Sequence, residues 1–278
     1  MTAVCLFGLG EAGGAFAVDL VAEPAVATVR AFDPDQTRPT PDGVERFDDP
    51  IAAVAGADLV IALTASADAA TAFEQTAFGQ AAFGQAAAAY PAGLLYADAS
   101  TSSPQLKAGL ARRGDELGVE VVDVALMTTV PGRGLRTPSL VAGHAADRYA
   151  ALVGTWGVPV DVAGTEAGEA ATRKLLRSVV MKGMAAVIVE AMDAADAAGL
   201  SDETYANIAD QMEAMDEGWV RRLVEGTWPH ATRRRHEMEA SAAMLTELGI
   251  EPVMTRSTVE ALRRAEAGRR VDLPPSRT

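Results

Sequence analysis

Short apolar runs alternate with alanine-rich stretches over the first half of the chain. The runs have the length and composition of buried strands, and they cover residues 3–8, 26–32, 58–63, 94–97 and 119–125. The stretches between them favour helices, the first of them over residues 13–22. Apolar strands separated by helices are typical of a parallel sheet that is covered on both faces. The pattern therefore predicts an α/β fold with a doubly wound parallel sheet.

Three segments of this half do not follow the alternation. Residues 34–43 hold three prolines and residues 131–138 read PGRGLRTP, so both are predicted as loops. Residues 69–90 are rich in alanine and repeat the tetrapeptide AFGQ at 77–80 and 82–85. We expect this segment to form a lengthened surface helix or loop, and we assign it no function.

The character of the chain changes at about residue 165, where strand-like runs nearly disappear. Residues 166–198 predict one long helix that ends at Gly199, and Ser201 opens the next helix. Further helical stretches are expected over residues 203–225, 232–248 and 256–267, followed by a disordered tail. The pattern thus predicts two domains, an α/β domain over residues 1–163 and an all-α domain over residues 164–278.

Composition and charge narrow the class of protein. The net charge of −14 repels nucleic acid and anionic membranes. No apolar run is long enough to span a bilayer, and residues 1–10 lack the basic residues of a signal peptide. The single cysteine, Cys5, excludes an internal disulfide and indicates a reducing, cytoplasmic location. The histidines His144, His230 and His236 are not spaced as zinc ligands, so no metal site is expected.

A glycine-rich turn follows the first predicted strand and opens the first predicted helix. It consists of Gly8, Leu9, Gly10, Glu11, Ala12 and Gly13, and it matches the pattern GxGxxG. In this context the first glycine allows a tight turn, the second lets a pyrophosphate approach the backbone, and the third permits close packing of helix on strand. The turn therefore predicts a Rossmann-type domain that binds a dinucleotide.

An aspartate closes the second predicted strand, 20 residues after the last glycine of the turn. The carboxylate of Asp33 can accept hydrogen bonds from both hydroxyls of an adenine ribose, and it would repel a 2′-phosphate. The spacing therefore predicts NAD as the preferred cofactor. Arg30 and Arg38 are near in sequence and keep NADP possible.

Further motifs carry a resemblance to a known superfamily. Asp98, Ser100, Thr101 and Pro104 follow the form D-x-S-T-x-x-P, and Lys174 stands in a helix at the lysine position of G-x-x-x-K-x-x-x-N. On these motifs the chain resembles the β-hydroxyacid dehydrogenase superfamily, which includes 3-hydroxyisobutyrate and 6-phosphogluconate dehydrogenases. It is most similar to the branch that has a 6-phosphogluconate dehydrogenase-like C-terminal domain of unknown function.

The resemblance implies roles for individual residues. Lys174 takes the catalytic position, as proton donor or acceptor in hydride transfer to or from a small hydroxy or oxo acid. Substrate contacts are implied for Ser100, Thr128, Thr129 and Ser178. Cofactor contacts are implied for the glycine turn and for Asp33, Thr64, Ala65 and His236. The superfamily also implies a homodimer in which the helical domain buries apolar surface against its partner.

The long helix that contains Lys174 has a polar and an apolar side. Ser178 and Lys182 follow Lys174 at intervals of four residues, so all three lie on neighbouring positions of one face. This face is either an ordinary basic surface in contact with water or the wall of an active site. A lysine suits the second interpretation, because oxidation of an alcohol requires a proton acceptor and the reverse reaction requires a donor.

Several positions depart from the superfamily pattern. Met127, Thr128 and Thr129 replace the serine and two glycines of the substrate loop, and Ser178 replaces an asparagine. Met181 replaces the glutamate of the decarboxylating enzyme, so decarboxylation is not expected. Two alternatives stay open, an imine reductase, against which the presence of Lys174 argues, and a non-catalytic dinucleotide-binding sensor.

Overall fold

The computed structural model describes residues 1–78, 93–268 and 270–276. These residues form two compact units, Met1–Arg177 and Ser178–Thr278. Most of the repeated AFGQ segment lies outside the described residues. The predicted boundary at 163–164 coincides with the end of the last strand, whereas the division between the compact units falls nine residues into the following helix.

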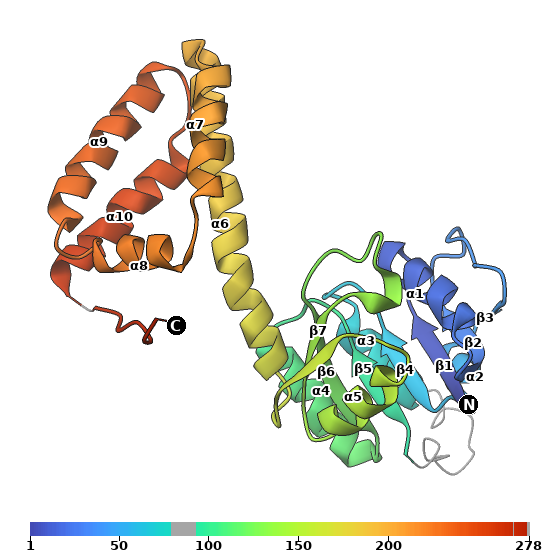
Figure 1. Cartoon of the computed structure of the whole chain (residues 1–278). Coiled ribbons are helices and arrows are strands. Elements are labelled where there is room, and N and C mark those ends of the chain that lie inside the picture. The colour runs from blue at the N-terminus through green and yellow to red at the C-terminus, as the bar shows by residue number, and fades with distance from the viewer. Residues whose placement is uncertain (79–92, 269, 277–278) are drawn as a thin grey trace. The chain divides into compact units, whose positions relative to one another are not determined.

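An eight-stranded sheet forms the centre of the first unit as far as the structure describes it (Figure 1). The strand order is β3-β2-β1-β4-β5-β6-β7-β8, and only β7 runs antiparallel to a neighbour, β6. The strands are β1 (Thr2–Phe7), β2 (Val26–Phe32), β3 (Val44–Phe47), β4 (Leu59–Ala62), β5 (Leu95–Asp98), β6 (Glu120–Leu126), β7 (Ser139–Ala142) and β8 (Val160–Gly164). The predicted α/β fold with a doubly wound parallel sheet is confirmed, except that β6 and β7 pair in antiparallel orientation. The predicted strands do not include β3, β7 and β8.

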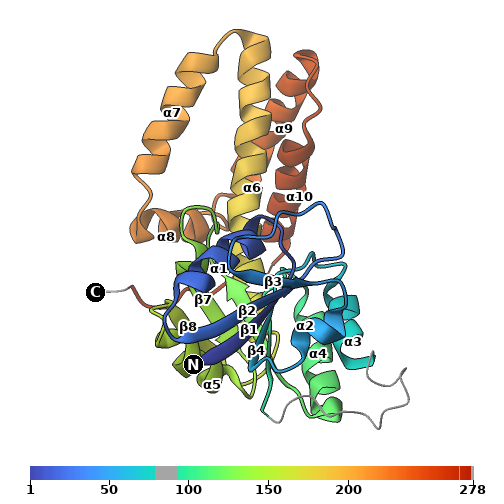
Figure 2. The same cartoon turned by 90° about the vertical axis from the view of Figure 1, so that its right-hand side faces the viewer.

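Helices cover both faces of this sheet, as a doubly wound fold requires (Figure 2). On one face α1 (Glu11–Ala22) and α5 (Ala146–Gly154) share a core with Val4 and Leu6 of β1. On the other, α2 (Pro50–Val54), α3 (Ala69–Phe78) and α4 (Pro104–Leu117) share a core with Cys5 and Phe7. Successive residues of β1 thus face opposite layers. Burial raises the pKa of the Cys5 thiol to about 12, so this cysteine stays protonated.

The second unit is helical, as predicted. Its helices are α6 (Glu169–Ala198), which begins in the first unit, α7 (Ser201–Glu213), α8 (Glu217–Glu225), α9 (Ala231–Glu247) and α10 (Val253–Ala267). The single helix expected over residues 203–225 is two helices. The break comes at Asp216, whose side chain accepts a hydrogen bond from the Trp219 N–H at 2.6 Å and so caps α8. None of the described helices is long and apolar enough to cross a membrane.

Glu190 of α6 holds the start of α10. Its carboxylate accepts hydrogen bonds from the N–H groups of Met254 (2.6 Å) and Thr255 (2.8 Å), and from the Thr255 hydroxyl (2.6 Å). Burial acts to raise the pKa of Glu190, but these hydrogen bonds outweigh it and hold the pKa below the usual 4.5. Glu190 therefore stabilises this unit as an anion.

Glu190→Gln is expected to lower the free energy of unfolding of this unit by about 1 kcal/mol at pH 7, the usual value of a helix cap. Because the folded pKa is depressed, the contribution is present above pH 4.5 and is lost as the pH falls through the folded pKa. Urea unfolding of both proteins between pH 7 and pH 3 measures this. Glu213→Gln on the exposed side of α7 is the control. A difference between Glu190→Gln and the native protein that persists unchanged at pH 3 would contradict the assignment.

Candidate cofactor and active site

The glycine turn lies between β1 and α1, and a side chain would be excluded for a different reason at each of its three glycines. Gly8 has a φ of +97°, and a Cβ on it would lie 2.9 Å from the carbonyl oxygen of Leu63. A Cβ on Gly13 would lie 1.9 Å from the carbonyl oxygen of Gly8. A Cβ on Gly10 would meet nothing within 4 Å. The fold itself requires Gly8 and Gly13, whereas Gly10 leaves open space beside the backbone for a ligand.

A cavity of about 400 Å³ opens beside this turn. It is bounded by the turn, the end of β2 and the segment after β4, and its lining includes Gly8, Gly10, Asp33, Arg38, Thr64, Ala65 and Asp68. The carboxyl ends of parallel strands meet here, at the point where the strand order reverses from β1 to β4. Dinucleotides bind at this position in doubly wound sheets.

Asp33 is buried at the edge of this cavity and is held by the backbone. One carboxylate oxygen accepts a hydrogen bond from the Leu9 N–H at 2.6 Å, and the other accepts from the Asp35 N–H at 2.8 Å. The Arg46 guanidinium donates to the main-chain carbonyls of Asp33 and Asp35, which ties down the loop after β2. Each carboxylate oxygen of Asp33 keeps a further lone pair, so an oriented acceptor stands ready for ribose hydroxyls.

Arg38 in the same cavity is paired within its own loop. Its guanidinium lies 3.1 Å from the carboxylate of Asp35. Hydrogen bonds from the Thr37 hydroxyl and N–H, together with Arg38, hold the pKa of Asp35 below its usual range. The positive charge of Arg38 is offset by Asp35, whereas the carboxylate of Asp33 lines the cavity without an ion pair to any cationic side chain among the described residues.

A second cavity of about 440 Å³ adjoins the other side of the turn. Its lining consists of Glu11, Ala12, Leu63, Thr64, Ala99, Thr101, Leu126, Thr128, Thr129, Val130, Pro131 and Lys174. The Lys174 ammonium donates a hydrogen bond to the Thr101 hydroxyl at 2.9 Å. Arg177 donates to the main-chain carbonyl of Met127, which ties the loop of Thr128 and Thr129 to α6. The ammonium group of Lys174 thus faces a cavity that is lined by apolar side chains and by threonine hydroxyls.

Thr64 connects the two cavities, since it lines both. Its hydroxyl oxygen is buried, and it has no hydrogen-bond partner within the residues that the structure describes. A buried hydroxyl without a partner costs free energy unless a ligand or water satisfies it. Together with the open space at Gly10, this hydroxyl indicates a polar ligand that extends from the first cavity into the second.

Most of the predicted site residues of the first unit come together at these two cavities. Leu9 and Gly13 are buried behind the turn, and Ser100 is buried and bonded to Asp98 and Ser102. The sequence assigned Ser100 to the site, but its neighbour Thr101 lines the second cavity instead. Ser178 and His236 belong to the second unit, and their roles stay predictions.

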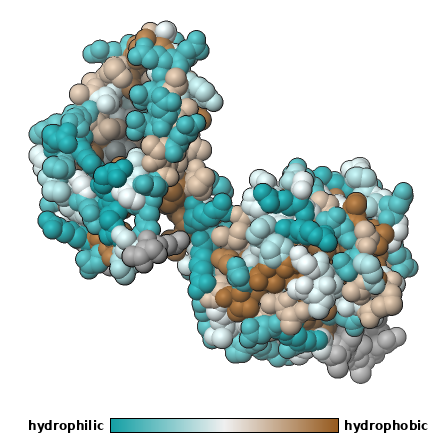
Figure 3. Space-filling model, in the orientation of Figure 1, coloured by the Kyte–Doolittle hydropathy of each residue, from teal (hydrophilic) through white to brown (hydrophobic). Residues whose placement is uncertain are grey.

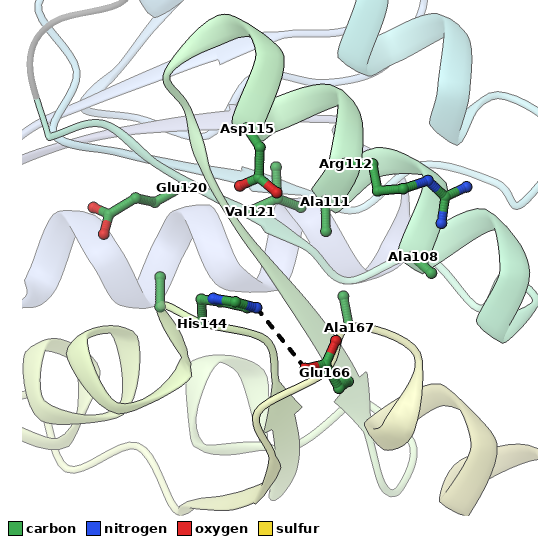
Figure 4. A pocket seen from close by; sticks show the side chains of 10 residues that line it. Ala108, Ala111, Arg112, Asp115, Glu120, Val121, His144, Glu166 and Ala167 are labelled. Atoms are coloured by element: carbon green, nitrogen blue, oxygen red, sulfur yellow. Dashed lines mark ion pairs between the residues drawn. The ribbon is translucent and has the colours of Figure 1, made fainter.

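A third pocket of the first unit lies between α4, β6 and the segments that precede α5 and α6 (Figure 4). His144 and Glu166 approach to 3.9 Å, and Figure 4 shows the Arg112 side chain turned away from this pair. The two side chains are 85% and 74% exposed, so their attraction is weak. The pocket brings together no group of residues suited to catalysis.

Comparison with known proteins agrees with this architecture. Residues 195–265 match the model of a domain of unknown function, DUF1932. DUF1932 is the C-terminal domain of the NAD(P)-binding 3-hydroxyacid dehydrogenase-like family, so the resemblance identified from the sequence is confirmed. An uncharacterized 28.5 kDa protein of Methanothermus fervidus is 26% identical over 172 residues, which is 62% of this chain and 66% of that protein.

Several solved structures share the fold over nearly the whole chain. A conserved hypothetical protein from Sinorhizobium meliloti is 25% identical with a TM-score of 0.59, over 96% of this chain and 89% of that one. A reductive aminase from Aspergillus terreus, in complex with NADPH4, cyclohexanone and allyl amine, is 20% identical with a TM-score of 0.76, over 95% and 93%. An imine reductase from Pseudomonas sp. is 16% identical with a TM-score of 0.75, over 96% and 94%.

Proposed function

We propose that this protein is an NAD(P)-dependent oxidoreductase that uses Lys174 as its proton donor and acceptor. The observation that carries the proposal is the second cavity, which brings Lys174 and Thr101 together beside the glycine turn. Hydride transfer to or from an oxygen-bearing carbon is accompanied by transfer of a proton, which needs a donor or acceptor. Lys174 supplies this group, beside the cavity at the glycine turn. The solved reductases of the same fold, which include structures with NADPH4 and NAD+, support the choice of cofactor class.

The residues present fit a nicotinamide dinucleotide. Gly10 and the start of α1 would receive the pyrophosphate, because the helix N-terminus offers free N–H groups beside open space. Asp33 would accept the adenine-ribose hydroxyls, and Thr64 would find a partner for its buried hydroxyl. When bound, the nicotinamide supplies or accepts the hydride.

The chain's own residues handle the proton. In reduction of a carbonyl, the Lys174 ammonium donates a proton to the oxygen that gains negative charge, and in oxidation the neutral amine accepts it from the hydroxyl. Thr101 accepts a hydrogen bond from Lys174 and so holds the ammonium at the cavity wall. Leu126, Val130 and Pro131 form apolar wall that limits access of water to the reacting atoms.

We expect NAD to bind more tightly than NADP. Asp33→Ala should lower the ratio of the NADP dissociation constant to the NAD dissociation constant at least about tenfold. The reason is that the 2′-phosphate of NADP would come close to the Asp33 carboxylate, and like charges repel. Isothermal titration of the native and variant proteins with both cofactors measures the two ratios. Asp68→Ala, which removes a carboxylate elsewhere in the same cavity, is the control. NADP binding as tight as NAD by the native protein would disprove the preference.

The substrate is proposed to be a small hydroxy or oxo compound with an acid group, since Lys174 and the threonines of the cavity suit oxygen ligands. Reduction of a C=N bond is the second candidate, and the likeness to the reductive aminase and imine reductase favours it. A panel of oxo acids, hydroxy acids and cyclic imines, followed by the absorbance of the nicotinamide, separates the two. Turnover of imines without turnover of any hydroxy or oxo acid would select the second candidate.

We further propose that the protein forms a homodimer through its helical unit. None of the residues of α7 and α8 is buried. Large apolar side chains of this unit are exposed, namely Val179, Val180, Met181, Val187, Val189, Leu200, Tyr205, Val220 and Leu223. In Figure 3 tan and brown residues are scattered among hydrophilic ones on the helical unit at the left, and a larger brown area lies on the α/β unit. Exposed apolar surface on this scale is a mark of a subunit interface.

Analytical ultracentrifugation is expected to give twice the chain mass of 28.8 kDa for the native protein. The double substitution of Val180 and Val189 by Asp should produce monomers, because it would bury unpaired carboxylates at the interface. Val18→Asp changes an equally exposed valine on α1 of the first unit and should leave the mass unchanged. A native protein that sediments as a monomer at all concentrations would contradict the proposal.

A further inference from the structure

A lysine is completely buried in the first unit, close to the second cavity but outside it. Lys107 of α4 is 1% exposed, and its ammonium lies 3.0 Å from a carboxylate oxygen of Asp98 and 3.5 Å from one of Asp123. Asp98 is the last residue of β5, and Asp123 lies beside it on β6. These three side chains are called here the buried triad.

The triad has two carboxylates and one ammonium group. One negative charge must therefore be compensated by groups outside the triad. The second carboxylate oxygen of Asp123 accepts hydrogen bonds from the N–H groups of Gly168 (2.9 Å) and Ala171 (3.0 Å). These N–H groups belong to the start of α6, whose dipole places partial positive charge there. The triad therefore binds the N-terminus of α6 as part of its own charge compensation.

The other end of the triad holds the segment that contains Thr101. The Lys107 ammonium donates to the main-chain carbonyl of Asp98 at 2.6 Å. The Asp98 carboxylate accepts hydrogen bonds from the N–H and the hydroxyl of Ser100 at 3.1 and 3.0 Å. Thr101 follows directly, and Lys174 comes less than one turn after Ala171. The hydrogen bond from Lys174 to Thr101 closes a ring of contacts that runs through the triad.

A purely structural role accounts poorly for three charges at this place. Burying ions costs several kcal/mol per ion, and apolar side chains of similar size often stabilise a core as well or better. Charged groups do, however, fix directions in space, because their hydrogen bonds need defined donors and acceptors. The two elements that this triad fixes are the ones that present Lys174 and Thr101 to the cavity.

We infer that Lys107 is a positioning residue: with Asp98 and Asp123 it sets the place of the Lys174 ammonium relative to Thr101. Only the expected effect on catalysis rests on the proposed role of Lys174 as proton donor and acceptor. Its geometry is testable without any substrate, so its failure and the failure of the proposed function are distinguishable.

The chain makes the test simple, because Lys107, Lys174 and Lys182 are its only lysines. In protein labelled with ¹³C and ¹⁵N, the ammonium nitrogen of Lys107 should show a hydrogen-bond coupling to the main-chain carbonyl carbon of Asp98. A cross-peak should join the ε-methylene of Lys174 to the γ-methyl of Thr101. Absence of either signal from the native protein would overturn the inference.

Two variants then test the positioning itself. Lys107→Met removes the central charge, and the triple variant Asp98→Asn, Lys107→Met, Asp123→Asn leaves the triad neutral, so that no carboxylate is left without a counter-charge. In either variant the cross-peak between Lys174 and Thr101 should be lost. Reductive methylation of Lys174 should become about fivefold faster, the equivalent of one hydrogen bond. Lys182, in the other unit, serves as the internal control and should react at its native rate.

A folded variant that keeps the cross-peak and the native methylation rate of Lys174 would overturn the inference. Failure of both variants to fold would also overturn it, because the triad would then serve the fold as a whole. Once a substrate is found, the folded variants should show a lower kcat with unchanged affinity for the cofactor.

Discussion

Lys174→Met is expected to lower kcat at least about 100-fold, the lower end of what a positioned general acid or base contributes. Methionine keeps the apolar stem and nearly the length of the lysine side chain, so α6 should fold as before. The affinity for the dinucleotide should change little, because Asp33 and Gly10 line the other cavity. Steady-state kinetics with a substrate from the panel, together with cofactor titration, measures both quantities.

The neighbouring Arg173 provides the matched control for this substitution. Its guanidinium lies 4.0 Å from the carboxylate of Glu169 one turn earlier, and it does not line the cavity, so Arg173→Met should keep native kcat. Native kcat in Lys174→Met would show that Lys174 is not the proton carrier. A higher KM with unchanged kcat would mean that Lys174 only binds the substrate.

Gly13→Ala is expected to destabilise the first unit by about 3 kcal/mol or more, the upper end of the range for overpacking. The added Cβ would lie 1.9 Å from the carbonyl oxygen of Gly8, and neither backbone segment can move away without disturbing the turn. Gly10→Ala adds the same atom three residues earlier, where nothing lies within 4 Å. This variant should keep native stability and weaken dinucleotide binding at least about tenfold, since the atom would occupy ligand space.

Thermal unfolding and cofactor titration on both variants distinguish the fold from the site. The predicted pattern is loss of stability in Gly13→Ala and loss of affinity alone in Gly10→Ala. Native affinity in a stable Gly10→Ala protein would mean that no ligand approaches this part of the backbone. Gly13→Ala thus tests whether the fold requires a glycine, and Gly10→Ala tests whether a ligand approaches the backbone.

The sequence predicted the first unit best where its elements are long and uniform. β2 was placed correctly over all of Val26–Phe32, because seven mostly apolar residues between turn signals are a clear pattern. β3 (VERF) alternates apolar and charged residues, β7 (SLVA) directly follows a loop rich in glycine and proline, and β8 includes the exposed Asp161 and Val162. None of the three is a uniform apolar run like β4 or β5, which are just as short. Their places in the sheet follow from tertiary contacts that periodicity does not encode.

In the candidate site, too, some residues could be predicted from the sequence and others could not. The glycine turn, Asp33 and Lys174 were found because fixed spacings accompany their chemistry. The sequence did not distinguish Ser100 from Thr101, because both hydroxyls follow β5 and only the turn of the chain decides which faces the cavity. Lys107 did leave a signal. It shares a buried stripe of α4 with Leu110 and Gly114, where a charge requires buried carboxylates such as Asp98 and Asp123 at nearby strands.

Binding of a nicotinamide dinucleotide is tested most directly by an equilibrium titration of the native protein with NADH and NADPH, followed by nicotinamide fluorescence. We expect saturable binding of one dinucleotide per chain, which is tighter for NADH, weakened by Gly10→Ala and retained in Lys174→Met. Absence of saturable binding of either dinucleotide by the folded native protein would show that the glycine turn is not a dinucleotide site.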